Sequence, residues 1–260
     1  MENHDKLDES RPAGFTARLW NVASVRSLKA PFACATIVSI GVREMPASAF
    51  TFKFDEDTVY VPENFQEYHR TFYALGRFYE EDLLRHIRQL ERAGTYVDVG
   101  GGVGNHSVFF ARFCKARRVH TFEPNKKLHP YVDALASANG VRDRIKLHPF
   151  GLSGAEKMGE ATFILREQGD NITATVPLRR MDDVIAEDDV AVIKIDVEGA
   201  EPRVLRGATN VMERCRPVLF VEALSDRKRD KIMSIVGPLG YAMTGRVFRP
   251  SPCYEIAFAG

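Results

Sequence analysis

The chain has 260 residues, of which 45% are hydrophobic and 27% charged, as in an ordinary folded globular protein. Its 36 basic and 35 acidic residues leave a formal net charge of +1, so the composition offers no electrostatic footprint for a nucleic-acid backbone, and we expect no nucleic-acid partner. The amino terminus lacks the basic-then-apolar order of a signal peptide, no apolar run is long enough to span a bilayer, and the four cysteines show no Cys-x-x-Cys spacing. These features predict a cytoplasmic protein without a transmembrane segment.

The first 93 residues contain no recognisable chemical motif. Residues 1–14 are polar and are predicted to form a disordered tail, followed by an N-terminal extension over residues 15–93. Within the extension, residues 49–54 and 58–61 alternate as in a hairpin, and residues 79–92 have the apolar spacing of a helix. The extension is rich in aromatic residues, which either seal the edge of the sheet or line an acceptor pocket: Trp20, Phe50, Phe52, Phe54, Tyr60, Phe65, Tyr68, Phe72, Tyr73, Phe78 and Tyr79.

From residue 94 to residue 260 apolar strand patterns alternate with helical patterns. Strands are predicted over residues 95–99, 117–122, 144–148, 190–195, 217–222, 241–243 and 254–258, and helices over residues 104–114, 126–138, 201–213 and 226–236. Residues 150–180 look like an irregular insert with one strand at 161–165. Such alternation predicts an α/β domain, in which helices cover both faces of a mostly parallel sheet.

A glycine cluster follows the first of these strands. Asp98 precedes Gly100, Gly102 and Gly104 in a D-x-G-x-G-x-G pattern, and glycines let the backbone approach a ligand closely. The next strand ends in Glu123, whose carboxylate is placed to accept hydrogen bonds from both hydroxyls of a ribose. The two features together predict a cofactor that carries a nucleoside.

The spacing favours one cofactor over another. A dinucleotide site requires a third glycine where this chain has Asn105, which disfavours a nicotinamide cofactor. Asp98 would repel a pyrophosphate, but it suits the sulfonium and ammonium groups of S-adenosylmethionine. We therefore predict an S-adenosylmethionine site.

A second block, Lys194-Ile-Asp-Val-Glu-Gly-Ala-Glu201, resembles the FkbM family of methyltransferases, as do the glycine loop, Phe122-Glu-Pro-Asn125 and Pro217-Val-Leu-Phe-Val-Glu222. The resemblance covers roughly residues 79–260. It implies a Rossmann-like class I methyltransferase fold with seven strands, one of them antiparallel near the end of the chain. It also implies that Pro124 and Asp196 lie at the cofactor. The family often has Ala-Asn within the glycine loop, where this chain has Gly101-Gly102, so an amide contact to the cofactor is lost or is supplied by Asn105.

Two catalytic schemes fit the polar residues expected at the strand ends. In the first, Asp196 or His106 removes the acceptor's proton, with Glu198 and Lys194 nearby. In the second, Asp196 and Glu222 hold a divalent cation such as Mg²⁺, which binds the acceptor oxygens. The sequence does not choose between them.

The resulting prediction is an S-adenosylmethionine-dependent O-methyltransferase. The resemblance implies a small-molecule or glycan acceptor, such as a hydroxyl on a sugar, a polyketide or another natural product. Two alternatives are a nicotinamide-dependent oxidoreductase and a non-catalytic binding module on a methyltransferase scaffold. A homodimer is left open.

Overall fold

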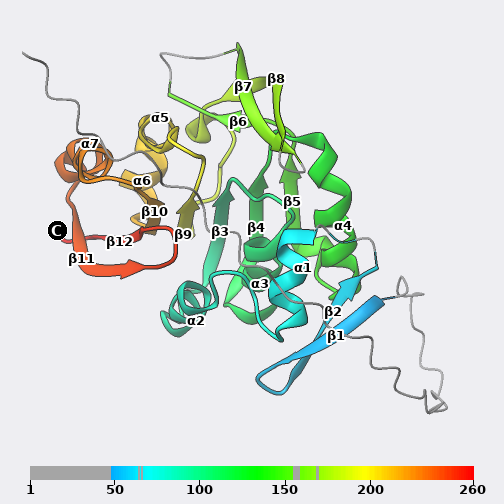
Figure 1. Cartoon of the computed structure of the whole chain (residues 1–260). Helices are drawn as coiled ribbons and strands as arrows, with labels where there is room; N and C mark the ends of the chain where they lie inside the picture. The colour runs from blue at the N-terminus through cyan, green and yellow to red at the C-terminus, as the bar shows by residue number, and fades with distance from the viewer. Residues whose placement is uncertain (1–47, 64, 66, 155–158, 168–169) are drawn as a thin grey trace, which may run out of the picture. The chain divides into compact units, whose positions relative to one another are not determined.

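A seven-stranded sheet runs in the order β11-β12-β10-β9-β3-β4-β5 through the computed structural model, which describes residues 48–63, 65, 67–154, 159–167 and 170–260 (Figure 1). All neighbouring pairs are parallel except those of β12, which runs antiparallel to both β10 and β11. This is the Rossmann-like arrangement that the sequence predicts, with one antiparallel strand near its carboxyl end. The strands are β3 (Gly94–Val99), β4 (Ala116–Phe122), β5 (Ile145–His148), β9 (Val190–Ile195), β10 (Val218–Glu222), β11 (Tyr241–Phe248) and β12 (Cys253–Phe258).

Helices cover both faces of this sheet because the central strands are apolar on both sides. All six residues of β3 and all six of β9 are buried. One face packs against α2 (Glu81–Gln89), α3 (Asn105–Phe113) and α4 (His129–Ala138). The other packs against α5 (Glu201–Arg206), α6 (Thr209–Cys215) and α7 (Asp226–Val236).

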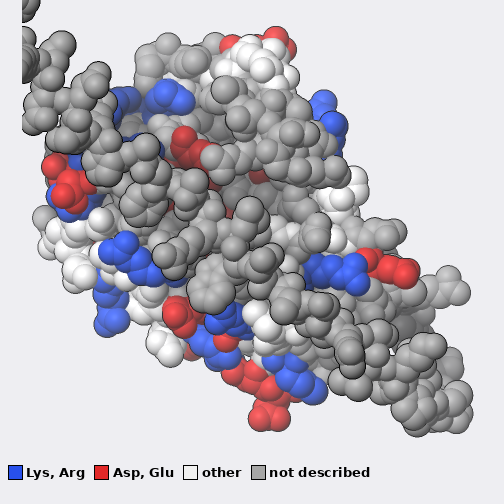
Figure 2. All heavy atoms as spheres, in the orientation of Figure 1, with Lys and Arg blue, Asp and Glu red and all other residues white. Residues whose placement is uncertain are grey.

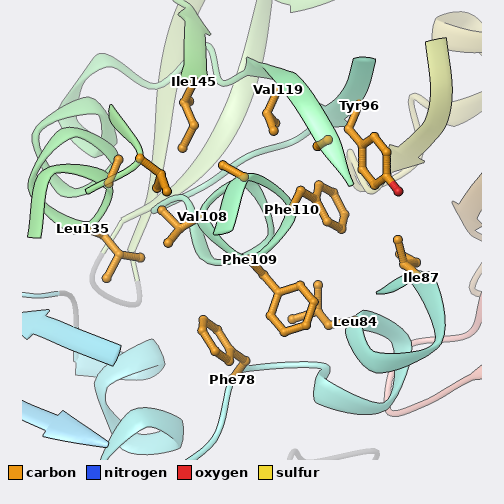
Figure 3. Packing of buried hydrophobic residues seen from close by; sticks show 14 of the residues in the cluster. Phe78, Leu84, Ile87, Tyr96, Val108, Phe109, Phe110, Val119, Leu135 and Ile145 are labelled. Atoms are coloured by element: carbon orange, nitrogen blue, oxygen red, sulfur yellow. The ribbon is translucent and has the colours of Figure 1, made fainter. Parts of the chain in front are cut away.

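Aromatic rings fill the core on the α2–α3 face. Phe109 meets Phe78 edge to face, with ring centroids 5.1 Å apart, and the Tyr96 ring of β3 packs against Phe110 at a centroid distance of 5.5 Å (Figure 3). Leu84 and Ile87, one helical turn apart in α2, are fully buried in the same cluster. The N-terminal extension therefore shares a core with the sheet.

The described part of the extension contains the predicted hairpin, formed by β1 (Ser48–Phe54) and β2 (Asp57–Pro62). A short helix, α1 (Glu67–Ala74), follows it. The predicted helix over residues 79–92 is confirmed as α2, although it is shorter at both ends. The predicted tail at 1–14 and the extension up to residue 47 lie outside the described residues.

The insert between β5 and β9 is more regular than the sequence analysis suggests. β7 (Gly159–Glu167) and β8 (Asp170–Arg179) form an antiparallel hairpin, and β6 (Gly151–Leu152) pairs with β8. In Figure 1 this hairpin lies on the side to which the arrowheads of β3 and β4 point. It therefore stands near the carboxyl ends of the parallel strands.

The predicted helix over residues 201–213 is two helices rather than one. α5 ends at Arg206 and α6 begins at Thr209, with Gly207 between them. A side chain at Gly207 would overlap the backbone carbonyl of Ser153, so glycine at this break lets the insert approach α5 and α6 closely. No helix in the described ranges is long and apolar enough to cross a membrane.

Candidate active site

The sheet topology gathers the predicted site residues at one edge. Asp98, Glu123 and Asp196 stand at or just after the carboxyl ends of β3, β4 and β9, and Glu222 ends β10. These four strands are neighbours and parallel, so their ends meet. Doubly wound sheets bind ligands at this edge.

The glycine loop has two kinds of glycine. A side chain at Gly100 would overlap the backbone carbonyl of Asp196, so this position is closed by the neighbouring strand end. A Cβ at Gly102 would have no atom within 4 Å. Both residues have positive φ angles, of 85° and 52°. The loop is therefore pinned to β9 at Gly100 and open at Gly102, which leaves room for a ligand beside its backbone.

Glu123 faces this open part of the loop. Its Oε2 accepts a hydrogen bond from Gly102 N–H at 2.9 Å, and its Oε1 accepts one from Asn125 N–H at 2.8 Å. Burial raises the pKa of Glu123 to about 7, although the two backbone hydrogen bonds act in the opposite direction. Each oxygen keeps a lone pair for a ribose hydroxyl. Pro124 lies half-buried between Glu123 and Asn125.

Asp98 is fully buried and only half satisfied. Ser107 Oγ donates to its Oδ2 at 2.5 Å, and Thr121 Oγ1 donates to Ser107 in turn at 2.7 Å. Oδ1 of Asp98 has no hydrogen-bond partner among the described residues. Since a buried carboxylate oxygen without a partner is costly, it suits a ligand that brings a positive charge or a donor.

Lys194 lies at the centre of the site, on the same face of the sheet as Asp98, with which it is in register. It is only 2% exposed, and its Nζ lies 3.4 Å from Asp196 Oδ2. Burial alone would lower the pKa of Lys194, but the charges of Asp196, Asp98 and Glu80 raise it above its usual value. The same ammonium group lowers the pKa of Asp196. Both groups are therefore charged at neutral pH.

Glu222 lies beside Asp196, but the pair makes a poor cation site. Burial and the adjacent charge of Asp196 raise the pKa of Glu222 to about 7, and Lys194 already faces Asp196. Within the described ranges no three His, Cys, Asp or Glu side chains come together as metal ligands. The described residues therefore do not support the scheme in which Asp196 and Glu222 hold Mg²⁺.

The acidic residues of the Lys194–Glu201 block have separate positions. Glu198 is exposed, with a φ of 51°, whereas Glu201 is buried and accepts hydrogen bonds from Val197 N–H and Gly199 N–H. Glu201, which the sequence analysis left without a role, thus fixes the turn after β9. Glu198 is exposed, whereas Lys194, beside which it was expected to act, is buried.

Asn105 has a different role from the expected cofactor contact. Its side-chain Oδ1 accepts from Tyr73 Oη at 2.9 Å and from Tyr79 N–H at 3.3 Å, and its Nδ2 donates to the Tyr79 carbonyl at 3.1 Å. Its amide is therefore engaged by the N-terminal extension. Tyr73, a candidate acceptor-pocket residue, is buried, and its hydroxyl donates a hydrogen bond to Asn105.

His106, the next residue, is buried and contacts a glutamate that sequence reasoning missed. His106 Nε2 lies 3.0 Å from Glu80 Oε2, and Glu80 occupies the left-handed N-cap position of α2. An acid before a helix is so common as a cap that nothing in the sequence distinguishes Glu80. His69 of α1 was also missed; burial, with the nearby charges of His106 and Lys194, lowers its pKa to about 4.

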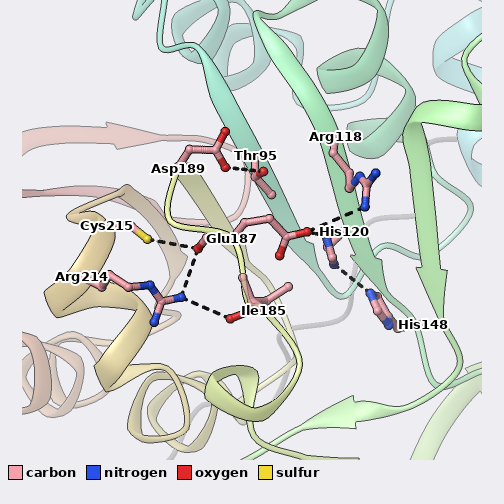
Figure 4. Close-up of polar contacts among 9 residues, drawn as sticks. All are labelled: Thr95, Arg118, His120, His148, Ile185, Glu187, Asp189, Arg214 and Cys215. Atoms are coloured by element: carbon pink, nitrogen blue, oxygen red, sulfur yellow. Dashed lines mark hydrogen bonds and ion pairs between the residues drawn. The ribbon is translucent and has the colours of Figure 1, made fainter.

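A second histidine cluster lies on the opposite face of the sheet. His120 Nδ1 is 3.0 Å from His148 Nε2, and His120 Nε2 is 2.9 Å from Glu187 Oε1 (Figure 4). His148 stacks on Phe122, with ring centroids 4.4 Å apart. Because His120 is in register with Val97 rather than with Asp98, this cluster is separate from the buried charges around Lys194.

Shape alone does not identify the site. A hollow of about 180 Å³ is lined by residues that include Arg92, Asp189 and Cys215, and another of about 370 Å³ by residues that include Arg118 and Arg144. Both lie toward the amino ends of the strands, away from the polar cluster. On the face shown in Figure 2, acidic and basic side chains are interspersed.

The sheet order, the glycine loop after β3 and the acid after β4 define the class I methyltransferase fold. The chain matches the family model described as the methyltransferase FkbM domain over residues 98–243, more than half of its length. It belongs to the FkbM methyltransferase family.

The chain is also similar to solved structures, at low sequence identity. An FkbM methyltransferase from Methylobacillus flagellatus shares 21% identity at a TM-score of 0.49, over 63% of this chain and 43% of that one. An S-adenosylmethionine-dependent O-methyltransferase from Thermotoga maritima shares 11% at 0.46, over 70% and 64%. A precorrin-6y C5,15-methyltransferase from Geobacter metallireducens shares 14% at 0.45, over 69% and 88%. The first two matches thus span less than two thirds of those proteins, and no curated protein matches the chain.

Proposed function

We propose that the chain is an S-adenosylmethionine-dependent O-methyltransferase that acts on a hydroxyl of a sugar, glycan, polyketide or other natural product. The observation that carries this proposal is the pairing of Glu123 with the open position of Gly102, beside the unpartnered oxygen of Asp98. Glu123 would hold the ribose and Asp98 the ammonium group. Gly102 gives the backbone room to approach the cofactor.

When bound, S-adenosylmethionine supplies an activated methyl group, so the protein must orient the acceptor and remove its proton. The charged and titratable groups near Lys194 suit that task better than they suit an amine acceptor. A neutral amine can attack before it loses a proton, whereas a hydroxyl gains much from a base in the transition state. This difference supports oxygen as the methylated atom.

The acceptor side of the site is aromatic. Tyr79 meets Tyr68 and Phe72 edge to face, with ring centroids 5.7 and 5.1 Å apart. Burial raises the pKa of Tyr79, and the charges of Glu80 and Asp196 act in the same direction. The ring cluster thus extends from Tyr79, near these two acids, to the exposed Tyr68. Sugar rings stack on such faces, and apolar pockets with a few fixed polar groups are usual for small ligands.

Calorimetry on the full chain tests the cofactor first. We expect binding of S-adenosylmethionine and S-adenosylhomocysteine but not of NAD, and loss of binding in Gly102→Val. Binding of NAD alone would favour an oxidoreductase. A screen with labelled methyl donor against sugar, polyketide and peptide acceptors then tests transfer. Cofactor binding without transfer to any acceptor would favour a binding module.

A further inference from the structure

We propose that Glu80 and His106 form an acid–histidine pair, in which His106 takes the proton of the acceptor hydroxyl and Glu80 holds the ring in place. The inference rests on the proposed O-methyl transfer and assigns its base. Glu80 would then be a positioning residue supplied by the N-terminal extension, outside the region that matches the family model.

The backbone brings the two residues together from separate segments. His106 is the second residue of α3, directly after the glycine loop, so its ring is fixed relative to the proposed cofactor site. Glu80 precedes α2 with φ and ψ of 55° and 39°, a left-handed conformation that non-glycine residues rarely adopt. The hydrogen bonds between Asn105 and Tyr79 hold the two segments in contact at the adjacent position in each. Strained residues of this kind gather at functional sites.

The His106 and Glu80 side chains are close, but their contact lacks the alignment of a hydrogen bond. His106 is 6% exposed and Glu80 is 8% exposed, and their nearest polar atoms are 3.0 Å apart. Neither atom has a well-aligned hydrogen bond within the described part of the chain. A pair that served only stability would be expected to satisfy both buried atoms. Catalytic hydrogen bonds, by contrast, are often poorly aligned until the ligands bind.

The surrounding charges keep Glu80 ionised. Burial alone would raise the pKa of Glu80, but the contact with His106 and the charge of Lys194 outweigh it and lower the pKa. The titratable groups around His106 are Glu80 and Tyr79 before α2, Asp196 after β9 and His69 of α1. The charge of Lys194 acts on Glu80 and His69. An ionised Glu80 stabilises the imidazolium that forms when His106 accepts a proton.

Asp196, the other candidate base, is already engaged. Its Oδ2 faces the Lys194 ammonium at 3.4 Å, so it would have to give up that partner to accept a proton. Among the described residues, the ion-pair partner of His106 is an acid, Glu80. The geometry therefore favours the histidine.

The step balances within the site. As the acceptor oxygen forms its bond to the methyl carbon, the bond from that carbon to the donor sulfur breaks and the sulfur keeps the electron pair. The hydroxyl proton moves to Nδ1 of His106, because Nε2 faces Glu80. The imidazolium then releases this proton to solvent, and no oxidant or reductant is needed.

Nuclear magnetic resonance of the histidine rings tests the pair without turnover. The full chain, labelled with ¹⁵N at its seven histidines, is compared with Glu80→Gln, with and without S-adenosylhomocysteine, and His106→Gln assigns the signal. We expect the ¹⁵N and ¹H signals of the His106 Nε2–H group to shift in Glu80→Gln, because the contact with a charged carboxylate is lost. Glu81→Gln is the matched control, since the neighbouring Glu81 pairs with Arg85 instead. Unchanged His106 signals in Glu80→Gln would overturn the pair.

Turnover tests the role of the base. With the first acceptor that the parent protein methylates, His106→Gln should lose about 10²–10⁴-fold in kcat while its affinity for S-adenosylhomocysteine stays within a few-fold. His120→Gln is the control, because His120 is also a buried histidine beside an acid but lies on the opposite face of the sheet. Full turnover in His106→Gln would refute the assignment but leave the proposed methyl transfer standing. A parent protein that binds no S-adenosylmethionine would contradict the proposed function, while the resonance comparison would still decide whether the pair exists.

If Glu80→Gln does not fold, Glu80→Asp keeps the charge and withdraws it by one methylene. We then expect a smaller shift of the His106 Nε2–H signals in the same direction. Signals identical to those of the parent would count against Glu80 as the positioning residue.

Discussion

The backbone carbonyl of Asp196 occupies the space that a side chain at Gly100 would need. The two conspicuous motifs of the sequence therefore interlock: the glycine loop after β3 closes onto the turn after β9. Asp196 N–H also donates to the Val99 carbonyl at 3.0 Å. The position of Asp196, next to Lys194, thus depends on a glycine at the end of the neighbouring strand of the sheet.

Gly100→Ala should destabilise the fold, because the methyl group meets backbone and the φ of 85° is strained for alanine. Overpacking and backbone strain each cost about 1–3 kcal/mol, so the unfolding free energy should fall by about 2–6 kcal/mol. Chemical denaturation measures the loss. Gly102→Ala is the matched variant: its methyl group enters open space, so we expect a smaller loss of stability but weaker cofactor binding. Equal stability losses in the two variants would contradict the distinction.

The affinity for S-adenosylhomocysteine should increase with pH through the titration of Glu123. The pKa of this buried carboxyl is about 7, and only the ionised form accepts from both ribose hydroxyls. Between pH 6 and pH 8 the ionised fraction rises about tenfold, so the dissociation constant should fall by a similar factor. Calorimetry at several pH values measures it. Glu123→Gln should bind more weakly and show no such increase. A parent protein with the same flat profile would separate Glu123 from cofactor binding.

The same carboxyl should also affect folding stability. Glu123 has a higher pKa in the folded chain than its ordinary value of 4.5, so the folded state binds the proton more tightly. The unfolding free energy of the ligand-free protein should therefore decrease as pH rises from about 4.5 to about 7. Denaturant titrations give the unfolding free energy of the parent and of Glu123→Gln at each pH. The value of the parent minus that of the variant should decrease as pH rises from about 4.5 to about 7. An increase of this difference with pH would contradict the prediction.

Asp196→Asn keeps the shape of the side chain and removes its charge. We expect nearly intact cofactor affinity and a loss of turnover by orders of magnitude, because Lys194 loses its nearest charged partner. Measurements in excess chelator belong to the same experiment. Full activity of the parent in chelator would exclude a required Mg²⁺, whereas a loss reversed by Mg²⁺ or Mn²⁺ would revive the metal scheme.

Two tyrosines of the extension should behave differently. Tyr73→Phe removes the hydroxyl that binds Asn105, so the unfolding free energy should fall by about 1–2 kcal/mol. Tyr68 is 56% exposed, so Tyr68→Ala should leave stability nearly unchanged and raise the KM for the acceptor. Acceptor kinetics that do not change in Tyr68→Ala would move the specificity region to residues 150–180.

The repeating part of the fold was predictable because its strands are apolar on both sides. The strands that end near Asp98, Glu123, Asp196 and Glu222 need only a short-range pattern, and all four occur where the pattern places them. The hairpin of β7 and β8 was missed in part because the alternation of threonine with apolar residues in β8 is weak. Such strands are specified by their pairing across the hairpin, which sequence spacing does not reveal.

The site residues could be predicted only where they belong to a recognisable sequence motif. Asp98, Gly102 and Glu123 follow recognisable patterns and lie together in the structure. Glu80 and His69 come from segments without a motif, and only the packing of the extension brings them to Lys194. Asn105 shows the reverse case: its position in the loop suggests a ligand contact, but a tertiary contact with Tyr73 and Tyr79 engages its side chain.

The position of β12 determines the order in which the last strands can join the sheet. β12 is made after β11, yet it lies between β11 and β10. During synthesis β11 therefore has no neighbour to join until β12 has left the ribosome, and β10 remains an open edge until then. A premature stop within residues 249–252 would leave both strands with unpaired backbone groups, which are a template for aggregation. Translation errors in this short turn should thus be removed as insoluble protein rather than accumulate as a slightly weakened enzyme.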